Sequence, residues 1–162
     1  MFPDSVMRLA KLLLTQASEA KLSIALAESC TGGLIAGAMT ELDGASAVVE
    51  RGFVVYSNRA KTEMLGVPPE LIEQYGAVSE EVARAMAEGA LKHSGAQLAV
   101  STTGIAGPTG GSPDKPIGLV HFAAARKSQT TLHLECHFGD IGRAKIRERS
   151  VEEALKLLLQ II

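Results

Sequence analysis

Apolar and polar positions alternate along the chain with two periods, one typical of helices and one typical of strands. Val6, Leu9 and Leu13 fall at helical spacing and predict a first helix from about Asp4 to Ala20, capped by Asp4 or Ser5. Further helices are predicted from Gly32-Gly33 to about Glu41, from Ser57-Asn58 through Lys61 to Leu65, from Pro68-Pro69, from Ser79, and from about Gly142 to Ile162.

Short apolar runs between these helices predict five strands, at residues 22–27, 52–56, 98–102, 118–125 and 130–138. The last two are joined by a short link and are expected to form an antiparallel hairpin. Strands that alternate with helices and end in a hairpin predict an α/β fold, a three-layer α/β/α sandwich with a mixed, mostly parallel sheet. Without a repeat or linker, we expect residues 1–162 to form a single domain.

Composition narrows the class of protein. The chain is 46% hydrophobic but only 4% aromatic, so its core must be largely aliphatic. Two cysteines are too few for a disulfide framework, and charges within the first helix argue against a signal peptide or a membrane span. The net charge of −2, without a basic tract, argues against nucleic acid as the main partner. We therefore expect a cytoplasmic protein with no membrane or nucleic-acid partner.

Polar or glycine-bearing turns follow three of the predicted strands, at residues 28–33, 56–58 and 102–108. The carboxyl ends of parallel strands meet at one edge of a sheet, where α/β proteins bind ligands. The sequence therefore predicts a site at this edge.

The turn after the first strand offers a nucleophile. Ser29 precedes a helix start, where the backbone N–H groups of Gly32 and Gly33 could receive a phosphate or a developing oxyanion. Ser29 and Thr31 could equally act only as helix caps. Cys30 is a rival nucleophile with greater intrinsic reactivity, but no nearby histidine in the sequence marks it as activated.

A base could come from the turn after the second strand. Lys61 is expected in the first turn of its helix, where the helix dipole and burial would both lower its pKa. The alternative is an ordinary solvated lysine. Tyr56 could donate a hydrogen bond into the site or simply fill the core.

The remaining candidates are ligand contacts. The glycine-rich loop that begins at Gly104 matches neither a Walker A motif nor a dinucleotide-binding fingerprint. Thr103 and the backbone that follows it could line a substrate site, or the loop could be only a surface crossover. Arg143 and Arg147, one helical turn apart, suggest an anion such as a phosphate, or else a solvated helix face.

One alternating segment could hold a metal ion, since His133, Glu135 and His137 share one face of a strand. The other face of this strand is apolar and is expected to be buried. We therefore expect the three polar side chains to lie on the solvent side of the hairpin. We assign no metal site.

Several motifs together resemble the CinA C-terminal domain family, whose stand-alone members include nicotinamide mononucleotide amidohydrolases. The resemblance extends over about residues 5–160 and rests on segments in the family's order, Ala27-Glu28-Ser29-Cys30-Thr31-Gly32-Gly33, Arg51-Gly52-Phe53, Tyr56-Ser57-Asn58 with Lys61, Gly76-Ala77-Val78-Ser79, Gly104-Ile105-Ala106-Gly107-Pro108 and Lys115-Pro116.

The resemblance implies hydrolysis of nicotinamide mononucleotide to nicotinic acid mononucleotide and ammonia, without a metal or organic cofactor, by a protein that forms a homodimer. It implies Ser29 as nucleophile and Lys61 as general base, with Tyr56 and Thr103 supporting them. Arg143 or Arg147 would bind the substrate phosphate, and Ser46 would also reach the substrate. Two alternatives stay open, a non-catalytic pyridine-nucleotide-binding module and an amidase for a different carboxamide.

Overall fold

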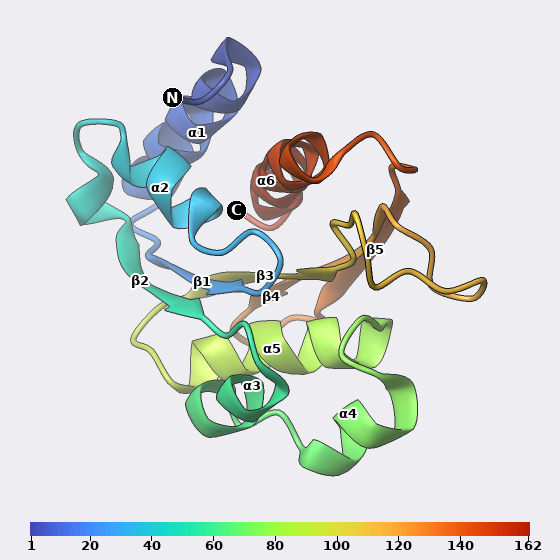
Figure 1. Ribbon diagram of the computed structural model, residues 1–162. Coiled ribbons are helices and arrows are strands. Elements are labelled where there is room, and N and C mark those ends of the chain that lie inside the picture. Colours follow the sequence, from blue (N-terminus) through green and yellow to red (C-terminus); the bar gives the residue numbers. More distant parts are fainter.

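A five-stranded sheet lies between two layers of helices in the computed structural model, which describes residues 1–162 (Figure 1). The strand order across the sheet is β2-β1-β3-β4-β5. The strands are β1 (Ile24–Glu28), β2 (Val49–Val54), β3 (Leu98–Gly104), β4 (Leu119–Arg126) and β5 (Leu132–His137).

The sheet is mixed, as predicted. β1 pairs in parallel with both β2 and β3, so that Leu26 aligns with Gly52 on one side and Val100 on the other. β4 runs antiparallel to β3, and β5 antiparallel to β4, which confirms the predicted hairpin. Four of the five strands therefore run in the same direction.

Three helices cover each face of the sheet, which confirms the predicted three-layer α/β/α fold. α1, α2 and α6 lie on one side, and α3, α4 and α5 on the other (Figure 1). The helices are α1 (Asp4–Glu19), α2 (Leu34–Thr40), α3 (Asn58–Leu65), α4 (Pro69–Tyr75), α5 (Glu80–Lys92) and α6 (Arg143–Leu159). No helix has the length and apolar character that a membrane crossing requires.

Alternation along β1 divides the core between the two faces. Ile24 and Leu26 pack in the cluster under α1 and α6, whereas Ala25 and Ala27 pack in the cluster under α3 and α5. Successive side chains of a strand point to opposite faces. The same alternation, continued past the end of β1, directs Ser29 toward α3 and directs Glu28 and Cys30 toward α2 and α6.

Some element boundaries differ from the prediction. β2 begins at Val49 rather than residue 52, because its pairing with β1 fixes its span and Glu50 and Arg51 can face water on this edge strand. The N-cap of α1 is Pro3, without a side-chain hydrogen bond, rather than Asp4 or Ser5. The predicted caps Ser57 and Ser79 are confirmed, since each hydroxyl accepts a backbone N–H of its own helix.

Candidate active site

Ser29 lies directly after β1, at the edge of the sheet that the sequence predicted. Its backbone N–H donates to the carbonyl of Thr102 at 3.1 Å, which ties it to the end of β3. The residue is 7% exposed, so its hydroxyl group lies in a nearly closed environment. We call residues 29–33 the Ser29 turn.

Lys61 reaches Ser29 from the facing helix layer. Ser57 caps α3 immediately after the chain leaves β2, and this places Lys61 one turn into the helix with its side chain under the sheet edge. The Lys61 Nζ lies 3.1 Å from Ser29 Oγ, 3.0 Å from the Val55 carbonyl and 3.3 Å from the Tyr56 carbonyl. The two residues that the sequence proposed as a dyad are therefore in hydrogen-bond contact.

The surroundings of Lys61 favour its neutral form. The residue is only 1% exposed, and burial lowers the pKa of its amine below the ordinary 10.5, against a smaller opposing effect from Cys30. No carboxylate forms an ion pair with it. Three oxygens surround Nζ and can each accept one of its N–H groups; once deprotonated, the amine can keep two N–H groups for the carbonyls and direct its lone pair toward Ser29 Oγ. This arrangement suits a general base.

Glu28 is a site residue that the sequence analysis missed. Its carboxylate accepts hydrogen bonds from the N–H groups of Gly33, Ile35 and Ala36 at 2.9–3.0 Å and so occupies the start of α2. The Gly32 N–H donates to the Ser29 carbonyl and the Gly33 N–H to Glu28, so the oxyanion role predicted for these two groups would require both bonds to open. A glutamate just before a helix start was the available signal.

Cys30, the rival nucleophile, points away from the base. Its side chain belongs to the apolar cluster on the α1 and α6 face, whereas Lys61 lies on the other face. Burial raises the pKa of the Cys30 thiol to about 11. The thiolate is the reactive form, so the structure favours Ser29.

Thr31, Thr103 and Gly104 lie at the site but hold the chain in place. The hydroxyls of Thr31 and Thr102 are 2.9 Å apart, and the Thr103 hydroxyl donates to the Ala77 carbonyl at 2.7 Å. A Cβ at Gly104 would stand 2.7 Å from Val120 Cγ2 and 2.9 Å from the Leu119 carbonyl oxygen, so glycine lets β3 and β4 close up here. These contacts fix the walls around Ser29.

Arg143 and Tyr56 stand at the outer side of the site. Tyr56 is 61% exposed and does not fill the core. The Arg143 guanidinium donates to the Tyr56 hydroxyl at 3.1 Å and to the Gly107 carbonyl at 3.0 Å. The loop that follows Gly107 lines a cavity of about 590 Å³ with Pro108–Pro113, Pro116 and Ile117, together with His137, Gly139 and Asp140. An exposed guanidinium can bind an anion.

Arg147 lies one turn further along α6, and its guanidinium is turned inward. Its Nε donates to the Cys30 carbonyl at 3.1 Å and its Nη2 to the Thr31 carbonyl at 3.0 Å. It therefore contacts the back of the Ser29 turn.

Ser46 lies apart from the other candidates. It is exposed in a short 3₁₀ turn (Ala45–Ala47) that precedes β2, at the level of Ile24 where β1 begins. Because β1 and β2 are parallel, Ser46 lies at the amino ends of the strands, whereas Ser29 lies at their carboxyl ends. Within one chain Ser46 does not join this site.

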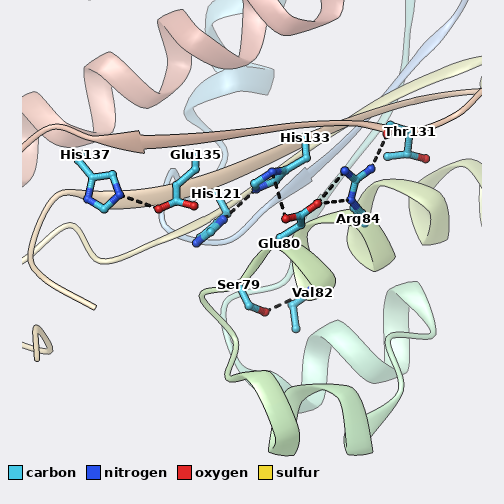
Figure 2. A network of polar contacts seen from close by, with 9 residues as sticks. All are labelled: Ser79, Glu80, Val82, Arg84, His121, Thr131, His133, Glu135 and His137. Carbon is cyan, nitrogen blue, oxygen red and sulfur yellow. Dashed lines mark hydrogen bonds and ion pairs between the residues drawn. The ribbon is translucent and has the colours of Figure 1, made fainter. Parts of the chain in front are cut away.

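The predicted polar face of the hairpin is only partly a solvent face. Glu135 and His137 are exposed, and their side chains contact each other at 2.6 Å (Figure 2), but His133 is largely covered by its neighbours. Its Nε2 lies 2.9 Å from His121 Nδ1, and its Nδ1 lies 3.6 Å from Glu80 on α5. Burial lowers the pKa of His121, although nearby Glu135 opposes this.

This network ties the first turn of α5 to the hairpin, since Glu80 also pairs with Arg84, which donates to the Thr131 carbonyl (Figure 2). The apolar face of β5 is half-buried rather than buried, because β5 is an edge strand and Leu132 is exposed. No three histidine, cysteine or acidic side chains converge where a metal ion could sit.

Comparison with known proteins finds relatives that are named CinA-like proteins. It is 52% identical to a CinA-like protein of Anaeromyxobacter sp. (strain K) over 135 residues, which are 83% of this chain and 33% of that relative. It is 49% identical to a CinA-like protein of Akkermansia muciniphila over 152 residues, 93% of this chain and 36% of the relative. The chain thus spans about a third of the length of these curated relatives.

Solved structures similar to this chain carry related names. The competence/damage inducible protein CihA from Agrobacterium tumefaciens superimposes with a TM-score of 0.98 at 51% identity, covering 99% of this chain and 98% of that one. A CinA superfamily protein from Escherichia coli gives 0.92 at 33% identity, covering 100% and 94%. The family model of the CinA C-terminal domain matches residues 6–162. The chain belongs to the CinA C-terminal domain family.

Proposed function

We propose that this protein hydrolyses the carboxamide of nicotinamide mononucleotide to nicotinic acid mononucleotide and ammonia, with Ser29 as nucleophile and Lys61 as general base. One observation carries the proposal, the buried amine of Lys61 held 3.1 Å from the Ser29 hydroxyl without an ionic partner. Burying such an amine is costly unless it is neutral or paired. A serine beside a neutral lysine is an arrangement suited to acyl transfer.

The first half of the reaction forms an ester. Ser29 Oγ attacks the carboxamide carbon while its proton passes to Lys61 Nζ. The carbonyls of Val55 and Tyr56 accept the other N–H groups of Nζ and hold its lone pair toward Ser29. The tetrahedral intermediate then breaks its C–N bond, and the proton on Lys61 leaves with the departing ammonia. General acid–base assistance of this kind contributes about 10²–10⁴-fold to the rate.

The second half regenerates the enzyme. Lys61, neutral again, takes a proton from water, which attacks the ester carbonyl. The C–Oγ bond breaks, the proton returns to Ser29, and the carboxylic acid product departs. Each step uses only the substrate, water and the two side chains.

Arg143 supports a phosphorylated substrate. Its guanidinium is exposed, donates to the Tyr56 hydroxyl two residues after β2, and donates to the carbonyl of Gly107, which directly precedes the cavity-lining loop. Tyr56 in turn connects to the dyad, because its carbonyl contacts Lys61 Nζ. We assign the phosphate contact to Arg143 rather than Arg147, whose guanidinium is engaged with two backbone carbonyls.

Ammonia release from nicotinamide mononucleotide, measured with chelator-treated protein, tests the proposal. Wild-type protein should turn over, whereas Ser29→Ala and Lys61→Met should lose activity by at least about 10²-fold. Ser18→Ala and Lys92→Met are matched controls, because both positions are exposed and lie outside the site. Tight nucleotide binding without turnover would instead indicate a binding module, and turnover of only another amide would indicate an amidase of different specificity.

A further inference from the structure

Arg147 makes a two-point contact with the backbone of the Ser29 turn. Its Nε and Nη2 atoms donate to two successive carbonyls, those of Cys30 and Thr31, at 3.1 and 3.0 Å. The guanidinium fork is planar and rigid, so two such bonds fix the orientation of the acceptors as well as their position. Arg147 comes from α6, more than a hundred residues further along the chain, so the contact is purely tertiary.

The rest of the turn is held from other directions. The Ser29 carbonyl accepts the Gly32 N–H at 3.0 Å, and the N–H groups at the start of α2 are capped by Glu28. The Cys30 carbonyl accepts from no other protein group, so Arg147 supplies its partner, whereas the Thr31 carbonyl also accepts the Leu34 N–H at 3.2 Å.

Gly32 shows how closely the guanidinium fits. This residue adopts a left-handed conformation with φ of +59°, and a Cβ there would lie 3.4 Å from Arg147 Nη2. Because the peptide groups are planar and trans, fixing the carbonyl of Cys30 also fixes the peptide plane that begins one residue after Ser29. A displacement of that plane would carry Cys30 Cα with it and so shift the Ser29–Cys30 peptide relative to Lys61.

We infer that Arg147 is a positioning residue that clamps the backbone of the Ser29 turn and so holds Ser29 Oγ in register with Lys61 Nζ. The inference rests on the proposed function for its catalytic consequence, but the clamp itself is a property of the fold. Arg147 acts through the turn and has no direct role at the substrate phosphate.

Steady-state kinetics separate a clamp from a phosphate ligand. We compare Arg147→Met, Arg147→Lys and Arg143→Met on nicotinamide mononucleotide and on the riboside that lacks its phosphate. Arg147→Met should lower kcat by about 10–100-fold on both substrates with KM little changed, since a displacement of about 1 Å can cost 10²-fold. Arg147→Lys should recover part of the loss. A raised KM for the nucleotide, with no effect on the riboside, would overturn the inference.

Hydrogen exchange gives a readout that does not depend on the substrate. In Arg147→Met, the amides of residues 32–36 should exchange at least about tenfold faster, because the turn that precedes α2 loses a restraint. Arg149→Met is the control, since Arg149 lies on the same helix but contacts Glu152 and Phe138 instead. Unchanged exchange in Arg147→Met would refute the clamp. If the wild type turns over neither substrate, the proposed function fails and the exchange result still decides the clamp.

Discussion

Gly89 provides the sharpest packing test, because replacing it by alanine should destabilise a helix that alanine ordinarily favours. Gly89 lies inside α5, where the end of α3 crosses it. A Cβ at this position would overlap the carbonyl oxygen of Leu65 and would lie 3.0 Å from the Leu65 carbonyl carbon and 3.1 Å from its Cβ. Carbon atoms prefer about 3.5–4.0 Å, so these two contacts alone would push α3 away by roughly 0.5–1 Å, and the overlap with the carbonyl oxygen requires more.

The magnitude follows from two opposing effects. Alanine gains about 1 kcal/mol over glycine in a helix interior, whereas overpacking a core costs about 1–3 kcal/mol. The upper end applies here because a backbone oxygen cannot rotate away. The net loss of about 2 kcal/mol should lower Tm by about 4–8 °C in a domain of this size. Activity should also fall, since α3 carries Lys61.

Thermal unfolding of Gly89→Ala beside Gly37→Ala checks this reasoning. Gly37 is also a helix-interior glycine, but a Cβ there would meet only the Phe2 ring, at 3.4 Å. The Gly37→Ala variant should gain about 0.5–1 kcal/mol from helix propensity. If Gly89→Ala raised Tm in the same way, the close packing of α3 on α5 would be refuted.

Three further changes follow from the site. Lys61→Met should raise Tm near neutral pH, because it removes a buried amine. In the wild type, the folded state binds the Lys61 proton less tightly than the unfolded state does, because burial lowers the pKa of the amine. The free energy of unfolding of the wild type should therefore rise with pH between the lowered pKa and 10.5, by about 1.4 kcal/mol for each pH unit by which the pKa is lowered. Over this range the difference in Tm between Lys61→Met and the wild type should become smaller. Glu28→Gln replaces an acceptor of three N–H groups by an amide, and urea unfolding should show a loss of about 1.5–3 kcal/mol together with reduced activity. Cys30→Ala should keep activity within a fewfold, and the native thiol should resist iodoacetamide at mildly alkaline pH, since its pKa is about 11; rapid alkylation would show that the thiol is not buried.

The layered fold was accessible from the sequence because local patterns agreed with one another. The alternation of apolar strands with capped helices predicted the three layers, and Ser57 and Ser79 marked two helix starts correctly. The meeting of Ser29 and Lys61 followed from the rule that parallel strands end at a common edge, together with the resemblance to the family. These features depend on short segments and on one topological rule.

The features that the sequence did not predict depend on long-range geometry. Arg143 and Arg147 share a helix face, yet one guanidinium reaches Tyr56 and the other reaches the Ser29 turn. The two guanidinium groups have different partners because of where α6 crosses the edge of the sheet. The spacing of the two arginines in the sequence does not reveal that position. Glu28 caps α2 because two left-handed glycines fold the chain back over the strand end.

The same limit applied to the histidines. Alternation placed His133, Glu135 and His137 on one face, but it could not show that the first turn of α5 covers His133. A strand pattern reports which residues share a face, and the partner that covers that face comes from elsewhere in the chain.

The dependence of kcat/KM on pH tests the central claim, that a neutral Lys61 activates Ser29. This parameter reports the ionisation of the free enzyme. We expect kcat/KM for nicotinamide mononucleotide to rise with pH and to level off above an apparent pKa that lies below 10.5, because burial lowers the pKa of Lys61. Lys61→Arg, which stays charged, should be inactive throughout. A flat profile, or an active Lys61→Arg variant, would contradict the claim.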